Sequence, residues 1–580
     1  MTDLFCNSSL FQYRSVVAGA ALLLVGAGAS PGGSARAQEP PPFPGDIGPG
    51  SLPTTRAAAA AATTGENTIS TAPQIRLGGF GFPTSAPAPE LSEPTRRWTV
   101  MPSIGVQLMG TDNVFQSVTD RRSDLITTIS PALMAAADTA RFKGVMNYAP
   151  NIQLYANTSG QNRVDHQFNG QGLLVVVPEL VFFDVRGSSS IQSLTSGFAP
   201  ESTALTSRGN TIQTTSLQAS PYIIHRFGDM VTVQAGYGYQ YVDQATGGGS
   251  NQPAGSTING VPTFIGQHFQ AHEFYAVART GPELGRLAFE GRLINTEYIG
   301  TGVLDGAYRR SASVETRYAI IRGVSALVEG GYEQQRYAGT PGVRIDGPIW
   351  AVGARIDFSA ESFLIAKYGR RDGFDSATVR ASLALGGRTS LSANYEERLS
   401  TSAQRAGDLL STTTLDELGN PIDLATGLPA VRPFSSSFLG VQSSLMRMRI
   451  GSAAIVQRWP RDTIALGLTY QEQTPISVAP GTVGFQQRGT SGSITWAHEL
   501  TERTFATAYV QYGTFDGGQG DGDVVSASLT FSHQLQPRLY GSLQLATYSR
   551  RNGQTSNVID QRINGRANQN IVLLALRQTF

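Results

Sequence analysis

Hydrophobic and polar residues alternate with a period of two along most of the chain. In the segment 524–533, Val525 and Leu529 fall on one face, whereas Ser526 and Thr530 fall on the other. This period indicates β-strands with one apolar face and one hydrated face. So many strands of this kind would leave a soluble sheet with too little to bury. A closed barrel instead places the apolar faces against lipid and the polar faces around water.

Short polar turns join the strands in pairs, and each turn contains Gly, Pro, Asp or a charged pair, as hairpins require. Longer connections rich in Gly, Ser and Asn alternate with these turns, the longest at residues 194–211, 244–267, 401–438 and 551–566. The ten short turns are Asp138-Thr139, Pro178-Glu179, Gly228-Asp229, Gly281-Pro282, Arg322-Gly323, Ala360-Glu361, Gly387-Arg388, Arg461-Asp462, Thr501-Glu502 and Gln536-Pro537.

Ten hairpins, with a first strand at 99–111 and a last strand at 570–580, predict about twenty-two strands. Because the segments 212–225 and 440–450 alternate weakly, the predicted range is about 18–24 strands. An even number places both chain ends on the short-turn side, as in bacterial outer-membrane barrels. The sequence therefore predicts an all-β fold, a transmembrane antiparallel β-barrel in the cell outer membrane.

The region ahead of the barrel differs in composition from the rest of the chain. The apolar run 16–28 and an A-x-A cleavage motif at 35–37 indicate a secretory signal peptide over residues 1–37. Residues 38–97 are rich in Pro, Ala and Gly, cannot build a core, and are predicted to form a disordered periplasmic linker. The barrel is expected over residues 98–580.

Charge and cysteine content narrow the chemistry. Lys and Arg number 44 against 43 Asp and Glu, a net charge of +1, so the basic surplus of a nucleic-acid-binding protein is missing. The single cysteine, Cys6, precedes the apolar run, so the mature chain has no disulfide, thiolate or Cys-zinc chemistry. No cofactor is expected.

Six acids and six bases fall on the polar face of strands near the middle of the barrel region. Such inward charges can pair across the wall and rigidify it, or they can narrow a channel and select solutes, and the sequence leaves both interpretations open. These candidate lumen charges are Glu290, Arg292, Glu315, Arg317, Glu329, Glu333, Arg355, Asp357, Lys367, Arg380, Glu396 and Arg398.

Catalysis is poorly supported by the sequence. His268 and His272 share a face, but four residues span about 13 Å in a strand, so the pair cannot hold one metal without help. An outer-membrane enzyme needs Ser or Asp beside His near the rim. No catalytic, cofactor-binding or metal-binding residue is therefore predicted. The loop 415–432 is expected to fold over the pore mouth or inward, with both options open.

The last strand ends the chain with an aromatic residue. Val572, Leu574, Leu576 and Phe580 share one face, a pattern similar to the signal that the barrel-assembly machinery reads, although Gln578 interrupts it. Phe580 is therefore the predicted barrel-assembly signal. The alternative is an ordinary edge strand that happens to end the chain.

Three blocks of sequence follow the linker: P-S-I-G-V-Q-L-M-G-T-D-N-V-F (Pro102–Phe115), S-D-L-I-T-T-I-S-P-A-L (Ser123–Leu133) and N-Y-A-P-N-I-Q-L-Y (Asn147–Tyr155). The chain resembles in these blocks the outer-membrane β-barrel porin type 2 family, some of whose relatives are associated with exopolysaccharide or PEP-CTERM systems. The resemblance implies a barrel over most of 98–580 and brings no catalytic residues.

The leading functional expectation is a porin-like channel for passive passage or export of polar solutes, with a link to exopolysaccharide secretion implied by the resemblance. One alternative is a non-transporting scaffold or surface-binding barrel, and another is a lipid- or glycan-modifying enzyme. The expected partners are outer-membrane lipid, the barrel-assembly machinery, and polysaccharide or small polar solutes.

Overall fold

The structure is a computed structural model that describes residues 98–194, 210–246, 257–258, 261–359, 362–415, 421–423, 439–517, 520–552 and 565–580. The predicted signal peptide and linker, residues 1–97, lie outside the described residues. The wall strands are β1 (Trp98–Thr111), β2 (Asp124–Asp138), β3 (Phe142–Tyr155), β4 (Arg163–Val177), β5 (Val181–Ser193), β6 (Thr211–Phe227), β7 (Val231–Thr246), β10 (Gln267–Thr280), β11 (Leu287–Gly300), β12 (Tyr308–Ile321), β13 (Val324–Tyr337), β14 (Val343–Asp357), β15 (Phe363–Arg371), β16 (Phe374–Leu385), β17 (Thr389–Thr401), β20 (Ser444–Arg458), β21 (Asp462–Val478), β22 (Gln487–Thr501), β23 (Thr504–Gly517), β24 (Gly522–Gln536), β25 (Leu539–Asn552) and β26 (Gly565–Thr579).

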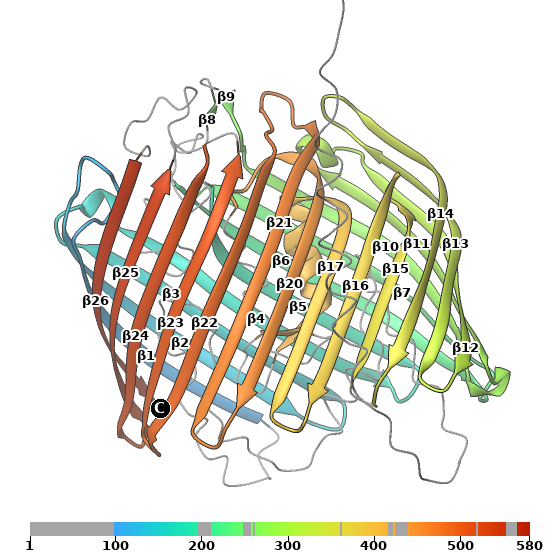
Figure 1. The fold of residues 1–580 in the computed structure, drawn as a ribbon, viewed down its shortest axis with the longest axis horizontal. Helices are drawn as coiled ribbons and strands as arrows, with labels where there is room; N and C mark the ends of the chain where they lie inside the picture. Colours follow the sequence, from blue (N-terminus) through green and yellow to red (C-terminus); the bar gives the residue numbers. More distant parts are fainter. Residues whose placement is uncertain are drawn as a thin grey trace, which may run out of the picture. The chain divides into compact units, whose positions relative to one another are not determined.

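These strands form one closed antiparallel barrel of twenty-two strands, as predicted (Figure 1). Each strand pairs with the next along the chain, and β26 pairs with β1 from Thr579 opposite Ser103 to Ile571 opposite Thr111. The pairs β7–β10 and β17–β20 continue the ring across two longer loops. Closure gives every wall strand two neighbours, as a sheet in lipid requires.

The smaller elements lie in the connections between wall strands. Short hairpins β8–β9 and β18–β19 and one α-helix belong to the longest loops. Their bounds are β8 (Thr257–Ile258), β9 (Val261–Pro262), α3 (Ser402–Thr412), β18 (Thr413–Leu415), β19 (Pro421–Asp423), and the 3-10 turns η1 (Ser159–Gln161), η4 (Pro282–Leu284) and η5 (Gly302–Leu304).

Nine of the predicted short turns lie between wall strands at the positions expected, and the tenth, Ala360-Glu361, lies outside the described residues. The weakly alternating segment 212–225 belongs to β6, and residues 444–450 of the second segment begin β20, with 440–443 in the loop before it. One tight turn, Asp372-Gly373 between β15 and β16, stands at the opposite, long-loop end of the barrel and was not predicted. Both ends of the barrel sequence, Trp98 and Phe580, lie at the short-turn end, where the Phe580 N–H donates to the Pro102 carbonyl over 2.9 Å.

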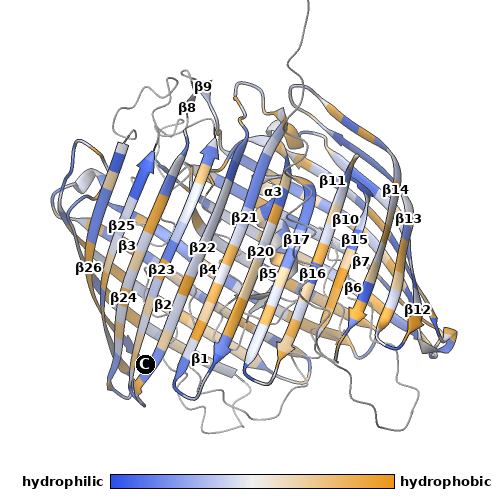
Figure 2. Cartoon of the chain, viewed as in Figure 1, coloured by the Kyte–Doolittle hydropathy of each residue, from blue (hydrophilic) through white to orange (hydrophobic). Residues whose placement is uncertain are grey.

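Side chains alternate between an apolar outer face and a polar inner face. On β13, Val328 is 54% exposed to the outside while the next residue, Glu329, is 5% exposed on the inside. Figure 2 shows hydrophobic positions recurring along the strands of the wall. Outward aromatic residues, among them Trp98 and Trp459 at the short-turn end and Trp350 farther along its strand, are exposed as in interfacial girdles. This pattern defines a transmembrane β-barrel of the outer membrane.

Among the described residues, no helix combines the length and the apolar character needed to cross a membrane.

The lipid-facing wall should be intolerant of charge. Leu574 on β26 faces outward and is 54% exposed, whereas Thr530 on β24 faces the lumen. We predict that Leu574→Arg lowers the free energy of unfolding in vesicles by about 2–4 kcal/mol, because lipid cannot solvate the guanidinium. Thr530→Arg is the matched control and should change it by less than about 1 kcal/mol. Equal losses measured by urea titration would contradict the assignment of the two faces.

Candidate functional site

A helix inside the barrel is the centre of the candidate site. Helix α3 follows β17 directly and packs against β5, β6, β7, β10 and β17. The Gln404 backbone N–H donates to Thr401 Oγ1 over 3.0 Å, and the Thr401 backbone N–H donates to Gln404 Oε1 over 3.0 Å. This reciprocal pair is a capping box, which starts a helix where the strand ends. The chain therefore enters the lumen directly after β17. Most of the loop 415–432, whose course the sequence left open, lies outside the described residues.

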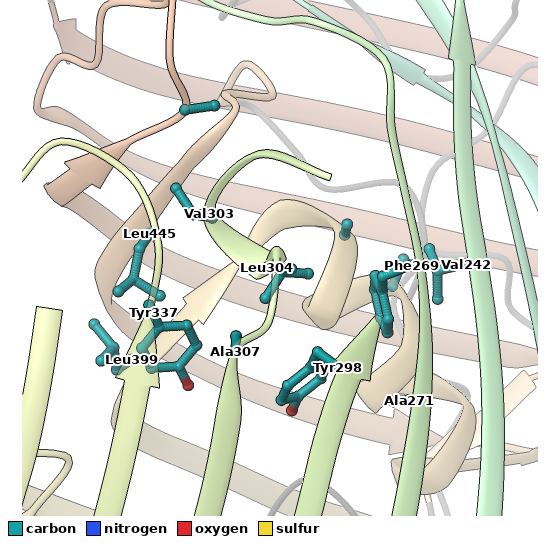
Figure 3. Close-up of a cluster of buried hydrophobic side chains, with 13 residues drawn as sticks. Val242, Phe269, Ala271, Tyr298, Val303, Leu304, Ala307, Tyr337, Leu399 and Leu445 are labelled. Carbon is teal, nitrogen blue, oxygen red and sulfur yellow. The ribbon is translucent and has the colours of Figure 1, made fainter. Parts of the chain in front are cut away.

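One face of α3 is apolar and small. Ala403, Ala406 and Leu410 recur at helical spacing and are buried. Figure 3 shows the buried cluster that receives this face, with Tyr298 and Tyr337 from the wall among its labelled members. Gly407 lies so close to the Gln240 side chain that a Cβ there would stand 2.3 Å from Gln240 Nε2. Small residues thus let the helix approach the wall closely.

Two arginines on different parts of the wall anchor α3. Arg398 of β17 bonds Asp408 of the helix over 3.1 Å. Arg186 of β5 donates to the carbonyl of Leu410 over 2.8 Å and pairs with Asp184 over 2.7 Å, so a cation meets the last turn of the helix. Because β5 and β17 stand ten strands apart in the ring of twenty-two, α3 crosses the lumen.

The predicted lumen charges lie on the inward face of β11–β17, and most of them are brought together as ion pairs. Glu290 is enclosed by Arg292 at 2.5 Å and by Arg279 at 2.6 Å. The other bridges are Lys367–Glu315 at 3.1 Å, Lys367–Glu329 at 3.9 Å, Arg371–Glu329 at 2.5 Å, Arg355–Asp357 at 2.7 Å and Arg398–Glu396 at 3.7 Å.

We call the inward charges of β11–β17 the charged belt. Three of the predicted residues in it do not take part in the ion pairs named above. Glu333 accepts the Gly373 backbone N–H over 3.0 Å. Arg317 is buried among the bridged pairs, and Arg380 is half-buried opposite Ile365. The belt is therefore both part of the wall and part of the lumen surface.

Asp372, which the sequence analysis missed, accepts hydrogen bonds from residues of three different strands. It lies in the turn between β15 and β16, with a φ of 55°, and is almost fully buried. It receives Arg309 at 3.1 Å, the Gln335 amide at 2.7 Å and the Leu399 N–H at 3.0 Å. Burial alone would raise the pKa of Asp372, but the charge of Arg309 and these hydrogen bonds outweigh burial and lower that pKa below its usual value.

A second loop also folds inward. After β1 the chain buries Asn113, Val114 and Gln116 against the inner face of the barrel seam. The Asn113 amide donates to the Asn568 carbonyl over 3.0 Å, and the Gln116 amide donates to Gln569 over 3.0 Å. This insertion covers the inner face of the wall on the side of the barrel opposite β11–β17.

Outer loops from distant parts of the sequence hydrogen-bond to one another. The Ser443 N–H donates to the Thr263 carbonyl over 3.0 Å, and the Ala479 N–H donates to the Ser443 carbonyl over 3.0 Å. The Val483 N–H donates to the Pro262 carbonyl over 3.0 Å. The long-loop end of the barrel is thus an interlocked set of loops rather than separate tips.

The histidines do not assemble a catalytic centre within the described part of the chain. His272 bonds the Tyr237 hydroxyl over 2.6 Å, and His498 bonds Asp462 over 2.8 Å. None of the described histidines bonds both a carboxylate and a Ser or Thr hydroxyl. In the same residues no group of three or more His, Cys, Asp or Glu is placed to hold a metal.

Sequence reasoning missed the anchors of α3 for identifiable reasons. Alternation along β5 places Asp184 and Arg186 inward, but the predicted set of lumen charges covers only strands in the middle of the barrel region. The motif T-S-A-Q at 401–404 is a local helix-start pattern inside the predicted loop 401–438. Arg309 and Asp372 carry no local pattern, since their partnership joins residues far apart in sequence.

No protein-family model matches the chain, and no match is found among curated proteins. The chain is similar to the ferric-catecholate import receptor Fiu from E. coli K12 at 10% identity, over 82% of this chain and 81% of that one, with a TM-score of 0.44. It is similar to the ferric preacinetobactin receptor BauA from Acinetobacter baumannii at 12% identity, over 83% and 80%, with a TM-score of 0.43. It is similar to OccK2 from Pseudomonas aeruginosa at 9% identity, over 83% of this chain and 98% of that one, with a TM-score of 0.34. These scores support no inference about function.

Removing the charge of Asp372 should destabilise the barrel strongly. We predict that Asp372→Asn lowers the free energy of unfolding by about 3–5 kcal/mol, because Arg309 is left buried without its counter-charge. The matched control is Asp375→Asn in the same hairpin, whose pair with Arg370 is 3.8 Å long and half exposed. That substitution should cost less than about 1 kcal/mol, measured by chemical unfolding in detergent micelles.

The pH dependence of this difference provides an independent check. A lowered pKa in the folded state means that the stabilisation by Asp372 is complete above its usual value of about 4 and is lost as pH falls through the folded value. The gap between wild type and Asp372→Asn should therefore stay constant from neutral pH to about 5 and shrink below about 4. A gap that already closes near neutral pH would contradict the ion pair.

Proposed function

We propose that this barrel is a channel for small polar solutes in which α3 forms the constriction. The observation that carries the proposal is the course of α3 from the β17 wall to the anchor Arg186 on β5. A lumen lined by polar side chains and narrowed by a helix selects by width and by charge. The charges near α3 include both signs, which suits uncharged or zwitterionic polar solutes.

The charged belt supports this proposal in a specific way. Because its acids and bases are bridged, the belt holds the wall rigid and presents little net charge. Selectivity would then depend on residues that face both the belt and α3, above all Arg398 and Glu396. The link to exopolysaccharide secretion rests on the sequence resemblance alone and stays a prediction.

A second candidate function is a non-transporting scaffold whose outer surface binds partners. The interlocked outer loops favour it, because hydrogen bonds among the Thr263, Ser443 and Ala479 segments would hold a fixed surface and obstruct the mouth. The two functions differ in conductance: a scaffold barrel should pass little current in a planar bilayer.

Releasing α3 should widen the channel. We predict that the double variant Arg186→Ala and Asp408→Ala raises the single-channel conductance in planar bilayers, because it removes the polar anchors on both sides of the lumen. The control is Arg344→Ala with Asp346→Ala, an exposed outer-face pair 3.8 Å apart. Unchanged conductance in the anchor variant, with a measurable current in wild type, would show that α3 does not limit flow.

Removing lumen bases should change ion selectivity. We predict that Arg380→Ala with Arg398→Ala shifts the reversal potential of a KCl gradient toward cation selectivity, because Glu396 and Asp408 then lose a positive neighbour. Arg310→Ala with Arg370→Ala removes the same charge from exposed outward positions and should leave selectivity unchanged. Unchanged selectivity in the lumen variant would make these arginines part of the wall only.

A further inference from the structure

The short-turn rim of the barrel carries arginine at most of its turns. The side chains in question lie within a turn or no more than two residues from it, and all are exposed. Eight of the ten turns contribute at least one such side chain. These inner-rim arginines are Arg141, Arg226, Arg286, Arg322, Arg388, Arg458, Arg461, Arg503 and Arg538.

The inner rim has a surplus of positive charge. Among the described residues, nine exposed arginines there stand against five exposed acids, namely Asp138, Glu179, Asp229, Glu283 and Glu502. The half-buried groups are two bases, Lys143 and Arg577, and three acids, Asp357, Asp462 and Glu499. They reduce the surplus of positive charge by one without removing it. The whole chain is nearly neutral, with a net charge of +1, so this surplus is local.

The same residues mark the edge of the apolar wall. Arg226 precedes Phe227, which is 55% exposed, and Arg458 and Arg461 flank Trp459, which is 42% exposed. Trp and other aromatic residues at the ends of transmembrane strands sit at the level of lipid headgroups. Arg461 lies in a turn at this level. Arg226 and Arg458 stand at the same height but start from the lumen side of their strands, because they alternate with the outward Phe227 and Trp459.

Outward arginines at the other end of the barrel are arranged differently. Arg310 pairs with Glu297 at 3.2 Å, and Arg551 pairs with Asp523 at 2.7 Å. Arg488 likewise meets an acid of the neighbouring strand, over 3.1 Å. Charge at the long-loop end is thus balanced in the wall, whereas the inner rim has more bases than acids.

We propose that the inner-rim arginines bind the phosphate groups of anionic phospholipids in the inner leaflet of the membrane. A guanidinium group presents a planar fork of donors that fits two phosphate oxygens at once. Each basic residue near an anionic membrane surface contributes about 1 kcal/mol of attraction. Arginine on most turns then gives the barrel a shell of anionic lipid and fixes its height in the membrane.

The four tryptophans of the chain allow a local test. Replacing Trp98, Trp350 and Trp496 by Phe leaves Trp459, between Arg458 and Arg461, as the reporter. The full barrel is refolded into phosphatidylethanolamine vesicles containing either brominated phosphatidylglycerol or brominated phosphatidylcholine, and quenching of Trp459 measures how far each lipid is enriched beside it. Wild type should prefer phosphatidylglycerol at least about fivefold.

The variant Arg458→Gln with Arg461→Gln should lose this preference, whereas Arg344→Gln with Arg370→Gln, which removes the same charge at the long-loop end, should keep it. Folding of each variant is verified by heat-modifiable mobility in gels. Equal quenching by both lipids in wild type, or equal loss in the control variant, overturns the proposal.

Two further arms separate lipid from other anions. Inorganic phosphate, compared with chloride at the same ionic strength, should leave the lipid preference unchanged; abolition of the preference would assign the arginines to free phosphate and overturn the lipid assignment. Polyglutamate that shifts Trp459 emission in zwitterionic vesicles, together with no preference for phosphatidylglycerol, would assign the rim to a soluble acidic partner instead.

Discussion

The hydrogen-bonded seam between β26 and β1 is the constraint from which the rest of the structure follows. Lipid offers no partner for a backbone N–H or carbonyl, so a sheet in the membrane is stable only when its first and last strands pair. Closure at a fixed register assigns every side chain to one of two faces. The outer face must then be apolar, and every charge that the strands carry must point into the lumen or lie at a rim.

A lumen this well supplied with charge cannot be filled like the core of a soluble protein. Burying a charge costs free energy unless it is paired. The belt on β11–β17 meets that requirement with bridges between acids and bases that lie one to three strands apart. Helix α3 is held in the lumen by apolar packing and by contacts with charged side chains. Its alanine face packs on the wall, and Asp408 and the Leu410 carbonyl meet arginines.

The sequence predicted the strand number, the turn positions and the inward charges because these features depend on local patterns. Alternation and turn chemistry act over a few residues, so they identify β24 or the Gly228-Asp229 turn without knowledge of distant contacts. The role of Asp372 could not be predicted in this way, because its partners Arg309, Gln335 and Leu399 belong to three other strands that are distant in sequence. The capping box at Thr401 and Gln404 is a local pattern and could be recognised in the sequence. Alternation along the strands, however, does not indicate that a helix lies inside the barrel.

Asp372 also links the wall to α3. The β16–β17 ladder ends at Val379 opposite Tyr395, while β17 continues beside β20 as far as Thr401. The freed end of β17 is held by the Leu399 N–H on Asp372, and α3 begins three residues later. One carboxylate therefore closes the β15–β16 hairpin and sets where the chain leaves the wall for the lumen. Because both tasks depend on the same carboxylate, the position of α3 in the lumen and the stability of this part of the barrel are coupled, and neither can be altered there alone.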